Sequence, residues 1–341
     1  MADWEVAAQE ELNGANPFAK LTHKGNGWSI LPYYEQNQIK PDPLLTASGN
    51  EFLGARCWYN CPSIEVLDAK TSNGAALECL REGADGILFE LSTAVDFKIL
   101  LENIEWKYCS LNFLAKQNQG NHILALDQFI KEKKTTTDQF HGAFFGNTIA
   151  SGIRNQQFYF SGFTMEPNAD PVEELVKGWR RYASDPWHTS AIKASDMYRP
   201  TPAFSITLTP DFFLSIAKLR AMRMIWKKYL TTSGLNQTNI FIHACSPPWI
   251  NDNFQPHGNM LKSTTAAMAG ILGGCDALTI EPEDRNHAMM SRIARNVSNV
   301  LREESFFSKV ADPLAGSYFI EDLSNQLTEA AWKSINSQPA K

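Results

Sequence analysis

Residues 203–244, AFSITLTPDFFLSIAKLRAMRMIWKKYLTTSGLNQTNIFIHA, contain the pattern that decides the fold. Ala203–Leu208 and Ile240–Ala244 are short, mostly apolar runs, as expected of strands buried on both faces of a parallel sheet. Between them, Thr209-Pro210 introduces a helical stretch, Asp211–Leu230, whose apolar side chains recur near one stripe together with Arg223. The segment therefore predicts a strand–helix–strand unit of an α/β protein.

The same alternation of strands and helices runs through the chain from about residue 50. The candidate strands are Ala55–Asn60, Gly86–Leu91, Tyr108–Leu114, Gly142–Phe145, Phe158–Ser161, Ala203–Leu208, Ile240–Ala244 and Ala277–Ile280. Further candidate helices are Asn73–Gly83, Pro171–Tyr182 and Gln326–Ile335. This count predicts a (β/α)8 TIM barrel over residues 46–341, whereas the lack of a G-x-G-x-x-G string argues against a doubly wound dinucleotide-binding sheet.

Residues 1–45 differ from the barrel in their composition. They contain the turn-forming strings NG, GNG and KPDP, and their apolar pieces are short, such as WSILP at 28–32. A segment this polar cannot bury itself, so we expect an extended N-terminal arm that lies on another surface.

Charge and hydropathy exclude several classes of protein. The 341 residues include 31 Lys and Arg against 37 Asp and Glu, and the resulting net charge of −6 argues against a nucleic-acid-binding surface. No apolar run approaches the roughly 18 residues of a membrane-spanning helix. The acidic residues Asp3 and Glu5 do not fit a signal peptide. We expect a soluble, cytoplasmic protein without a nucleic-acid or membrane partner.

The six cysteines and seven histidines form no C-x-x-C, H-x-x-x-H or H-E-x-x-H string. We therefore expect no metal site and reduced, buried thiols. Cys57 and Cys61, four residues apart beside a candidate strand, leave a zinc site as the alternative.

In a TIM barrel, functional residues lie at the C-terminal ends of the strands. This rule selects His243, Glu90, and Tyr59 with Asn60 at the end of the first candidate strand. His243 could act as a general acid or donate a hydrogen bond to a carbonyl, or it could be a barrel histidine with its hydrogen bonds satisfied. Glu90 could be functional or a solvated carboxylate at the rim.

Several motifs carry a resemblance to a known family. They are HACSPPW and PHGNMLKSTTAAMAGILGG within His243–Gly274, CDALTI at Cys275–Ile280, SRIARN at Ser291–Asn296, DPLAGSY at Asp312–Tyr318, and FFLSIAKLRAMRMIW at Phe212–Trp226. In this order they closely resemble the barrel domain of methylmalonyl-CoA mutases, and the likeness extends upstream to Phe163–Trp179.

The resemblance implies an acyl-CoA thioester bound along the barrel axis, beneath adenosylcobalamin held by a separate flavodoxin-like domain. The implied reaction is the radical interconversion of methylmalonyl-CoA and succinyl-CoA. His243 falls where the family has the histidine that binds the substrate carbonyl. Tyr59, Glu90 and Lys262 are the candidates for a substrate pocket.

The chain also departs from the catalytic members of the family. Ser246-Pro247-Pro248 replaces their Thr-Ser-Gly after the histidine, and the two prolines remove backbone donors. Residues 44–50, LLTASGN, lack the active-site tyrosine, and Lys262 replaces an arginine. The cobalamin signature D-x-H-x-x-G is absent, so we expect no cobalamin-binding domain in these 341 residues.

These departures make the chain resemble the small, non-catalytic subunit of a heterodimeric mutase. Its partner would be the catalytic large subunit, which would bind adenosylcobalamin, and the arm at residues 1–45 would wrap that partner. The alternative is an active acyl-CoA mutase barrel that works with a separate cobalamin-binding protein.

Overall fold

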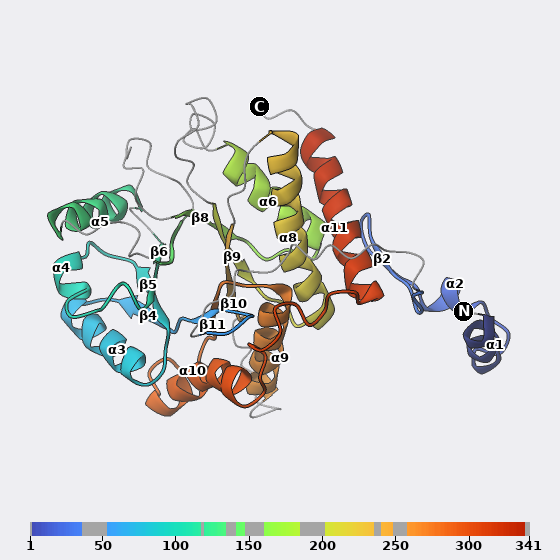
Figure 1. Ribbon diagram of the computed structural model, residues 1–341, viewed down its shortest axis with the longest axis horizontal. Helices are drawn as coiled ribbons and strands as arrows, with labels where there is room; N and C mark the ends of the chain where they lie inside the picture. Colours follow the sequence, from blue (N-terminus) through green and yellow to red (C-terminus); the bar gives the residue numbers. More distant parts are fainter. Residues whose placement is uncertain are drawn as a thin grey trace.

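A computed structural model describes residues 2–35, 53–116, 119–133, 141–146, 160–184, 202–234, 240–247 and 258–337. Figure 1 shows strands arranged around a common axis and surrounded by helices, with the N-terminal residues projecting to one side. The predicted α/β barrel is confirmed.

The first strand of the barrel consists of two pieces. The piece β3 (Tyr59–Asn60) pairs with β11 (Ala277–Thr279), whereas β4 (Ser63–Val66) pairs with β5 (Gly86–Leu91). Between them, the amide of Cys61 donates to the carbonyl of Leu278 (2.9 Å), and the carbonyl of Pro62 accepts from the amide of Leu88 (2.9 Å). The two pieces therefore act as one strand that joins both ends of the sheet and closes the ring.

The remaining strands are β6 (Ser110–Ala115), β7 (Ala143–Gly146), β8 (Phe160–Met165), β9 (Ala203–Thr207) and β10 (Phe241–Cys245). All pair in parallel in the order β3-β11-β10-β9-β8-β7-β6-β5-β4. These nine segments occupy eight strand positions, in agreement with the predicted barrel.

The pairing register also has the stagger of a TIM barrel. From Glu65 in β4, the paired residues lead through each neighbouring strand to Phe241 in β10. Two residues after Phe241, His243 is level with Ala277 and Tyr59. Phe241 is thus level with position 57, eight residues before the starting point, and a stagger of eight is characteristic of this fold.

Helices surround this ring. They are α3 (Ala69–Arg81), α4 (Phe97–Leu100), α5 (Gln119–Lys133), α6 (Pro171–Ser184), α8 (Phe212–Thr232), α9 (Gly258–Gly273), α10 (Ala288–Glu303) and α11 (Tyr318–Ser337). Asp170 and Asp211 begin α6 and α8 by accepting from the amides of Val172 and Leu214, at 2.9 Å each. Within the described part of the chain, no helix has the length and apolar character needed to cross a bilayer.

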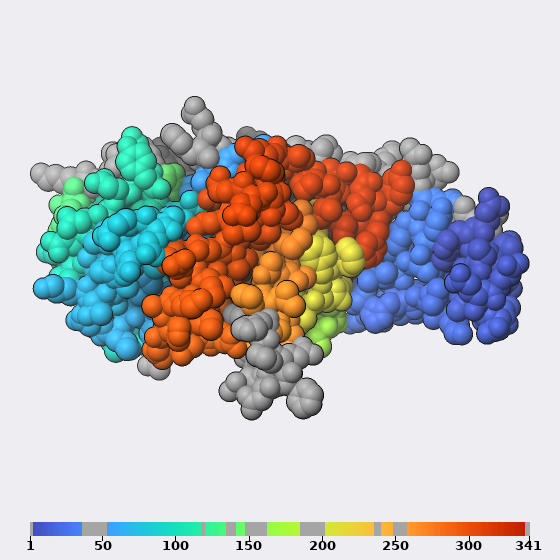
Figure 2. Space-filling view, turned by 90° about the horizontal axis from the view of Figure 1, so that it is seen from below, coloured from blue at the N-terminus to red at the C-terminus, as the bar shows by residue number. Residues whose placement is uncertain are grey.

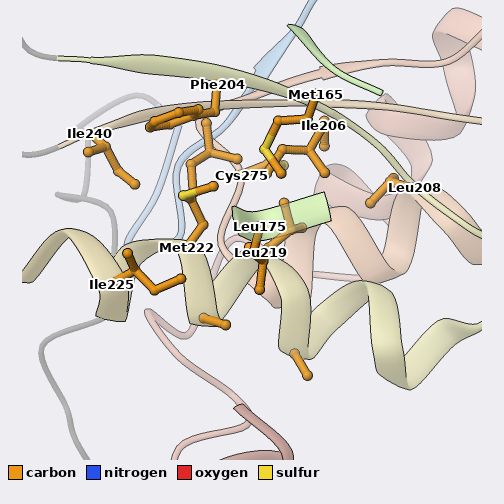
Figure 3. Close-up of a cluster of buried hydrophobic side chains, with 14 of the residues drawn as sticks. Met165, Leu175, Phe204, Ile206, Leu208, Leu219, Met222, Ile225, Ile240 and Cys275 are labelled. Carbon is orange, nitrogen blue, oxygen red and sulfur yellow. The ribbon is translucent and has the colours of Figure 1, made fainter. Parts of the chain in front are cut away.

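Helix α8 is buried on most of its circumference. Its inner face packs on the strands through Leu219, Met222 and Ile225 (Figure 3). Helices α9 and α11 cover other faces, and Lys218, Arg220 and Arg223 are buried as well. The prediction of a single apolar stripe was therefore wrong, because the sequence does not reveal how many helices pack around α8.

The N-terminal arm is folded as far as the structure describes it. Helices α1 (Ala2–Glu11) and α2 (Pro17–Leu21) precede a hairpin of β1 (His23–Lys24) and β2 (Ser29–Ile30). Trp28 of the hairpin enters the core, and the amide group of Gln326 in α11 exchanges two hydrogen bonds with the backbone of Ser29 (2.8 and 3.1 Å). Figure 2 shows α1 and α2 at the far end of the molecule, beyond the helices that border the arm.

Candidate functional site

The interior of the barrel is lined by alternate residues of each strand. In β5, Ile87, Phe89 and Leu91 face the surrounding helices, whereas Leu88 belongs to the cluster inside the ring. Because side chains alternate along a strand, Glu90 shares the inner face with Leu88. By the same rule Phe241, His243 and Cys245 of β10 point inward. The candidate site is therefore the interior of the barrel and its C-terminal end.

His243 lies in the middle of β10 and is only 1% exposed. Its ring nitrogens both meet hydroxyl groups of neighbouring strands. Nδ1 is 2.8 Å from Ser205 Oγ of β9, and Nε2 is 2.8 Å from Thr279 Oγ1 of β11. Thr279 in turn donates to the carbonyl of Cys61 at 2.6 Å. The histidine thus belongs to a chain of hydrogen bonds that runs from β9 to the first strand, across the seam where the barrel closes.

The hydrogen bonds define the tautomer of His243. Since the proton of the Thr279 hydroxyl goes to the carbonyl of Cys61, its oxygen accepts from His243, so Nε2 carries the ring proton. Nδ1 then accepts from the hydroxyl of Ser205. Burial lowers the pKa of His243 to about 4, so the ring is neutral at pH 7. This geometry favours the interpretation of His243 as a barrel histidine with both nitrogens satisfied.

Glu90 lies at the C-terminal end of β5 and is 4% exposed. One carboxylate oxygen accepts from Lys116 at 2.7 Å, and the other accepts from Arg285 at 2.6 Å. Burial by itself would raise the pKa of Glu90, but the hydrogen bonds from these two cations outweigh it and hold the pKa below its ordinary value. Glu90 is thus a paired carboxylate beneath the rim.

Tyr59 and Asn60 lie elsewhere than predicted. They begin the first strand, so the prediction that they lie at its C-terminal end was wrong. Tyr59 is half-buried, its ring lies 6.4 Å from that of His141, and burial raises its pKa to about 12. Asn60 points outward and donates to the carbonyl of Arg295 and the side chain of Asn299 in α10 (both 3.0 Å).

Lys262 is exposed on the outer helix α9. The structure therefore brings His243 and Glu90 to the inner face of the barrel, but it does not bring Lys262 there.

Ser205, Thr279, Lys116 and Arg285 were not among the predicted site residues. Ser205 and Thr279 are polar residues within the apolar runs AFSIT and ALTI, which is a signal that could have found them. Arg285 lies in a loop and reaches a residue 195 positions away, so no local pattern indicates its role.

The cysteines are all free thiols. Among the residues that the structure describes, no group of three or more His, Cys, Asp or Glu side chains could hold a metal ion. The pair Cys57 and Cys61 therefore gains no further ligand from that part of the chain.

Comparison with known proteins identifies the family. The family model for methylmalonyl-CoA mutase matches residues 189–338. The mitochondrial methylmalonyl-CoA mutase of Bos taurus is 33% identical over an alignment that covers 98% of this chain. The chain belongs to the methylmalonyl-CoA mutase family.

Two relatives are small subunits. The methylmalonyl-CoA mutase small subunit of Porphyromonas gingivalis is 27% identical over 97% of this chain, and that of Streptomyces virginiae is 40% identical over 38%. The chain spans 61% of the first of these relatives, 22% of the second and 54% of the bovine protein. The recognition of this family and its small subunits is thus confirmed, and the likeness reaches further toward the N-terminus than the motifs that first indicated it.

Proposed function

We propose that this chain is the small, non-catalytic subunit of a heterodimeric methylmalonyl-CoA mutase, in which it supports a catalytic large subunit. The observation that carries the proposal is the state of His243. Its two nitrogens are hydrogen-bonded to Ser205 and Thr279 at 2.8 Å each, so neither is available to a thioester carbonyl. Polarising a carbonyl in the transition state requires a donor aimed at the oxygen, and here the only N–H of the ring is already used.

His243, the buried histidine on the described inner face of the barrel, does not fit adenosylcobalamin as a lower ligand. Lower-ligand coordination of the cobalt would require a free imidazole nitrogen, and His243 has none. At the C-terminal end of the barrel, Lys116 and Arg285 both pair with Glu90. We therefore propose that the partner chain binds the cofactor. The six free thiols support a cytoplasmic location for the complex.

The N-terminal arm supports the assignment of a partner. Trp28 and the Gln326–Ser29 hydrogen bonds hold the hairpin to the barrel, while α1 and α2 extend beyond it (Figures 1 and 2). Trp4 lies against Phe18 and Tyr33, with ring centroids 5.5 and 5.0 Å apart, so this extension has a small aromatic centre of its own. We propose that residues 1–45 contact the large subunit.

Co-expression with the large subunit tests the function. The chain alone is expected to lack mutase activity, and the purified complex is expected to convert methylmalonyl-CoA to succinyl-CoA. Product analysis with isobutyryl-CoA and ethylmalonyl-CoA as alternative substrates identifies the thioester. If the chain itself turns over substrate when given a separate cobalamin-binding protein, it is an active acyl-CoA mutase barrel and the proposal is wrong.

A further inference from the structure

The loop between β11 and α10, residues 280–287, lies across the C-terminal ends of several strands. At its start, the amide of Glu281 donates to Ser246 Oγ, just after β10 (2.9 Å). The carboxylate of Glu281 accepts from Ser63 of the first strand (3.3 Å), and Cys245 lies beside it. The loop is therefore hydrogen-bonded to both neighbours of β11, namely the end of β10 and the first strand.

Arg285 extends this attachment to the other side of the first strand. Its guanidinium donates to Glu281 within the loop and, at 2.6 Å, to Glu90 on β5. Glu90 in turn accepts from Lys116, just after β6. A charge-assisted hydrogen bond to a buried carboxylate is stronger than one between neutral groups. The Arg285–Glu90 pair is thus the strongest link between the loop and the far strands among the contacts described here.

Behind the loop, the structure leaves space. A cavity of about 170 Å³ lies between α9 and α10, and its walls include Ile280 and Glu283 of the loop together with Met260, Met289, Ile293 and Val297. Ile280 is anchored in the main core, but residues 281–287 are half-buried or exposed, so they have little packing to hold them once the ion pairs are lost. The cavity leaves space into which this part of the loop can move when the ion pairs are lost.

We propose that residues 280–287 form a latch that closes the C-terminal end of the barrel interior, held shut by the Arg285–Glu90 ion pair. A closed latch would keep a ligand out of the barrel interior. Only the identity of that ligand, an acyl thioester, rests on the proposed function. The closure is a property of this chain alone, so it is tested without the large subunit and without mutase activity.

Cys245 is the reporter for the test, because its thiol lies beside the latch at the end of β10. The full chain is treated with methyl methanethiosulfonate, and the rate of labelling at each cysteine is followed by peptide mass spectrometry. The variants are Glu90→Gln and Arg285→Ala, with Glu283→Gln as the matched control in the same loop. Cys79, half-buried on α3, is the internal reference.

The two variants distinguish greater exposure of the Cys245 thiol from a change in its pKa. Burial is the main cause that raises the pKa of Cys245; the charges of Glu281 and Glu90 raise it further, and that of Arg285 lowers it. By charge alone, Glu90→Gln would therefore speed labelling and Arg285→Ala would slow it, because the thiolate is the reactive form. The latch predicts that labelling of Cys245 becomes faster in both variants, by about tenfold or more, while Cys79 and the control variant keep the wild-type rates.

Two results would overturn the proposal. Faster labelling in Glu90→Gln together with slower or unchanged labelling in Arg285→Ala would mean that only charge had changed. Unchanged labelling in both variants would mean that the ion pair does not hold the loop. Arg285 is 41% exposed, so its removal leaves the core intact, and a wild-type urea midpoint verifies that the variant is folded.

Discussion

The hydrogen-bond chain through His243 makes a quantitative prediction for Thr279→Val. Valine has nearly the shape of threonine, but it cannot accept from His243 Nε2 or donate to the carbonyl of Cys61, which Thr279 contacts at 2.8 and 2.6 Å. Thr279 and His243 are fully buried, so water cannot replace either partner. Two lost hydrogen bonds at about 1 kcal/mol each, together with the desolvation of the unpaired groups, give an expected loss of about 2–4 kcal/mol.

Urea unfolding followed by circular dichroism measures this loss. The midpoint is expected to fall with little change in slope, since the folded surface stays the same. The matched control is Thr265→Val on α9, where the exposed hydroxyl donates only to the carbonyl of Leu261 within its own helix (2.9 Å). That change is expected to alter stability by less than about 0.5 kcal/mol. A loss of the same small size for Thr279→Val would refute the reasoning that the hydrogen bonds through His243 and Thr279 stabilise the closed barrel.

Three further predictions concern a buried arginine, a titrating carboxylate and the arm. Arg223→Met removes a guanidinium that donates to the carbonyl of Gly274 and pairs with Asp276 at 2.7 Å, so unfolding in urea should show a loss of about 3 kcal/mol or more. The pKa of Glu90 is lowered in the folded chain, so its contribution to stability is full above the ordinary glutamate pKa of about 4.3 and is lost as the pH falls through the lowered value. Acidification should therefore shrink the stability difference between the wild type and Glu90→Gln, and a constant difference would contradict this assignment. Deletion of residues 2–21 should leave the urea midpoint of the isolated chain unchanged but weaken binding to the large subunit in sedimentation velocity, whereas equal affinity would contradict the proposed role of the arm.

The barrel could be predicted because its signal is local. Short apolar runs such as Gly86–Leu91, separated by helical stretches, indicate strands buried between a core and a helical layer. The first strand was predicted at Ala55–Asn60, several residues too early. Cys61 and Pro62 interrupt the observed strand, and a proline normally marks the end of a strand. Only the pairing of β3 with one neighbour and β4 with another reveals that the strand continues.

The site was less predictable because its properties depend on distant partners. The sequence indicated His243 but left open whether its hydrogen bonds were satisfied. In the structure, Ser205 and Thr279 of the neighbouring strands satisfy both ring nitrogens. Glu90 was selected as a rim carboxylate, but its pairing depends on Arg285 from the other end of the chain. Such contacts follow from the closure of the barrel rather than from any motif.

The most direct test of the account is the mutase activity of the complex reconstituted with His243→Ala in this chain. If the barrel is non-catalytic, the assembled complex keeps its activity within about threefold of the wild type, the size of an indirect packing effect of about 0.7 kcal/mol. Sedimentation velocity verifies that the variant is assembled. Loss of turnover in an intact complex would contradict the account and make His243 a catalytic residue.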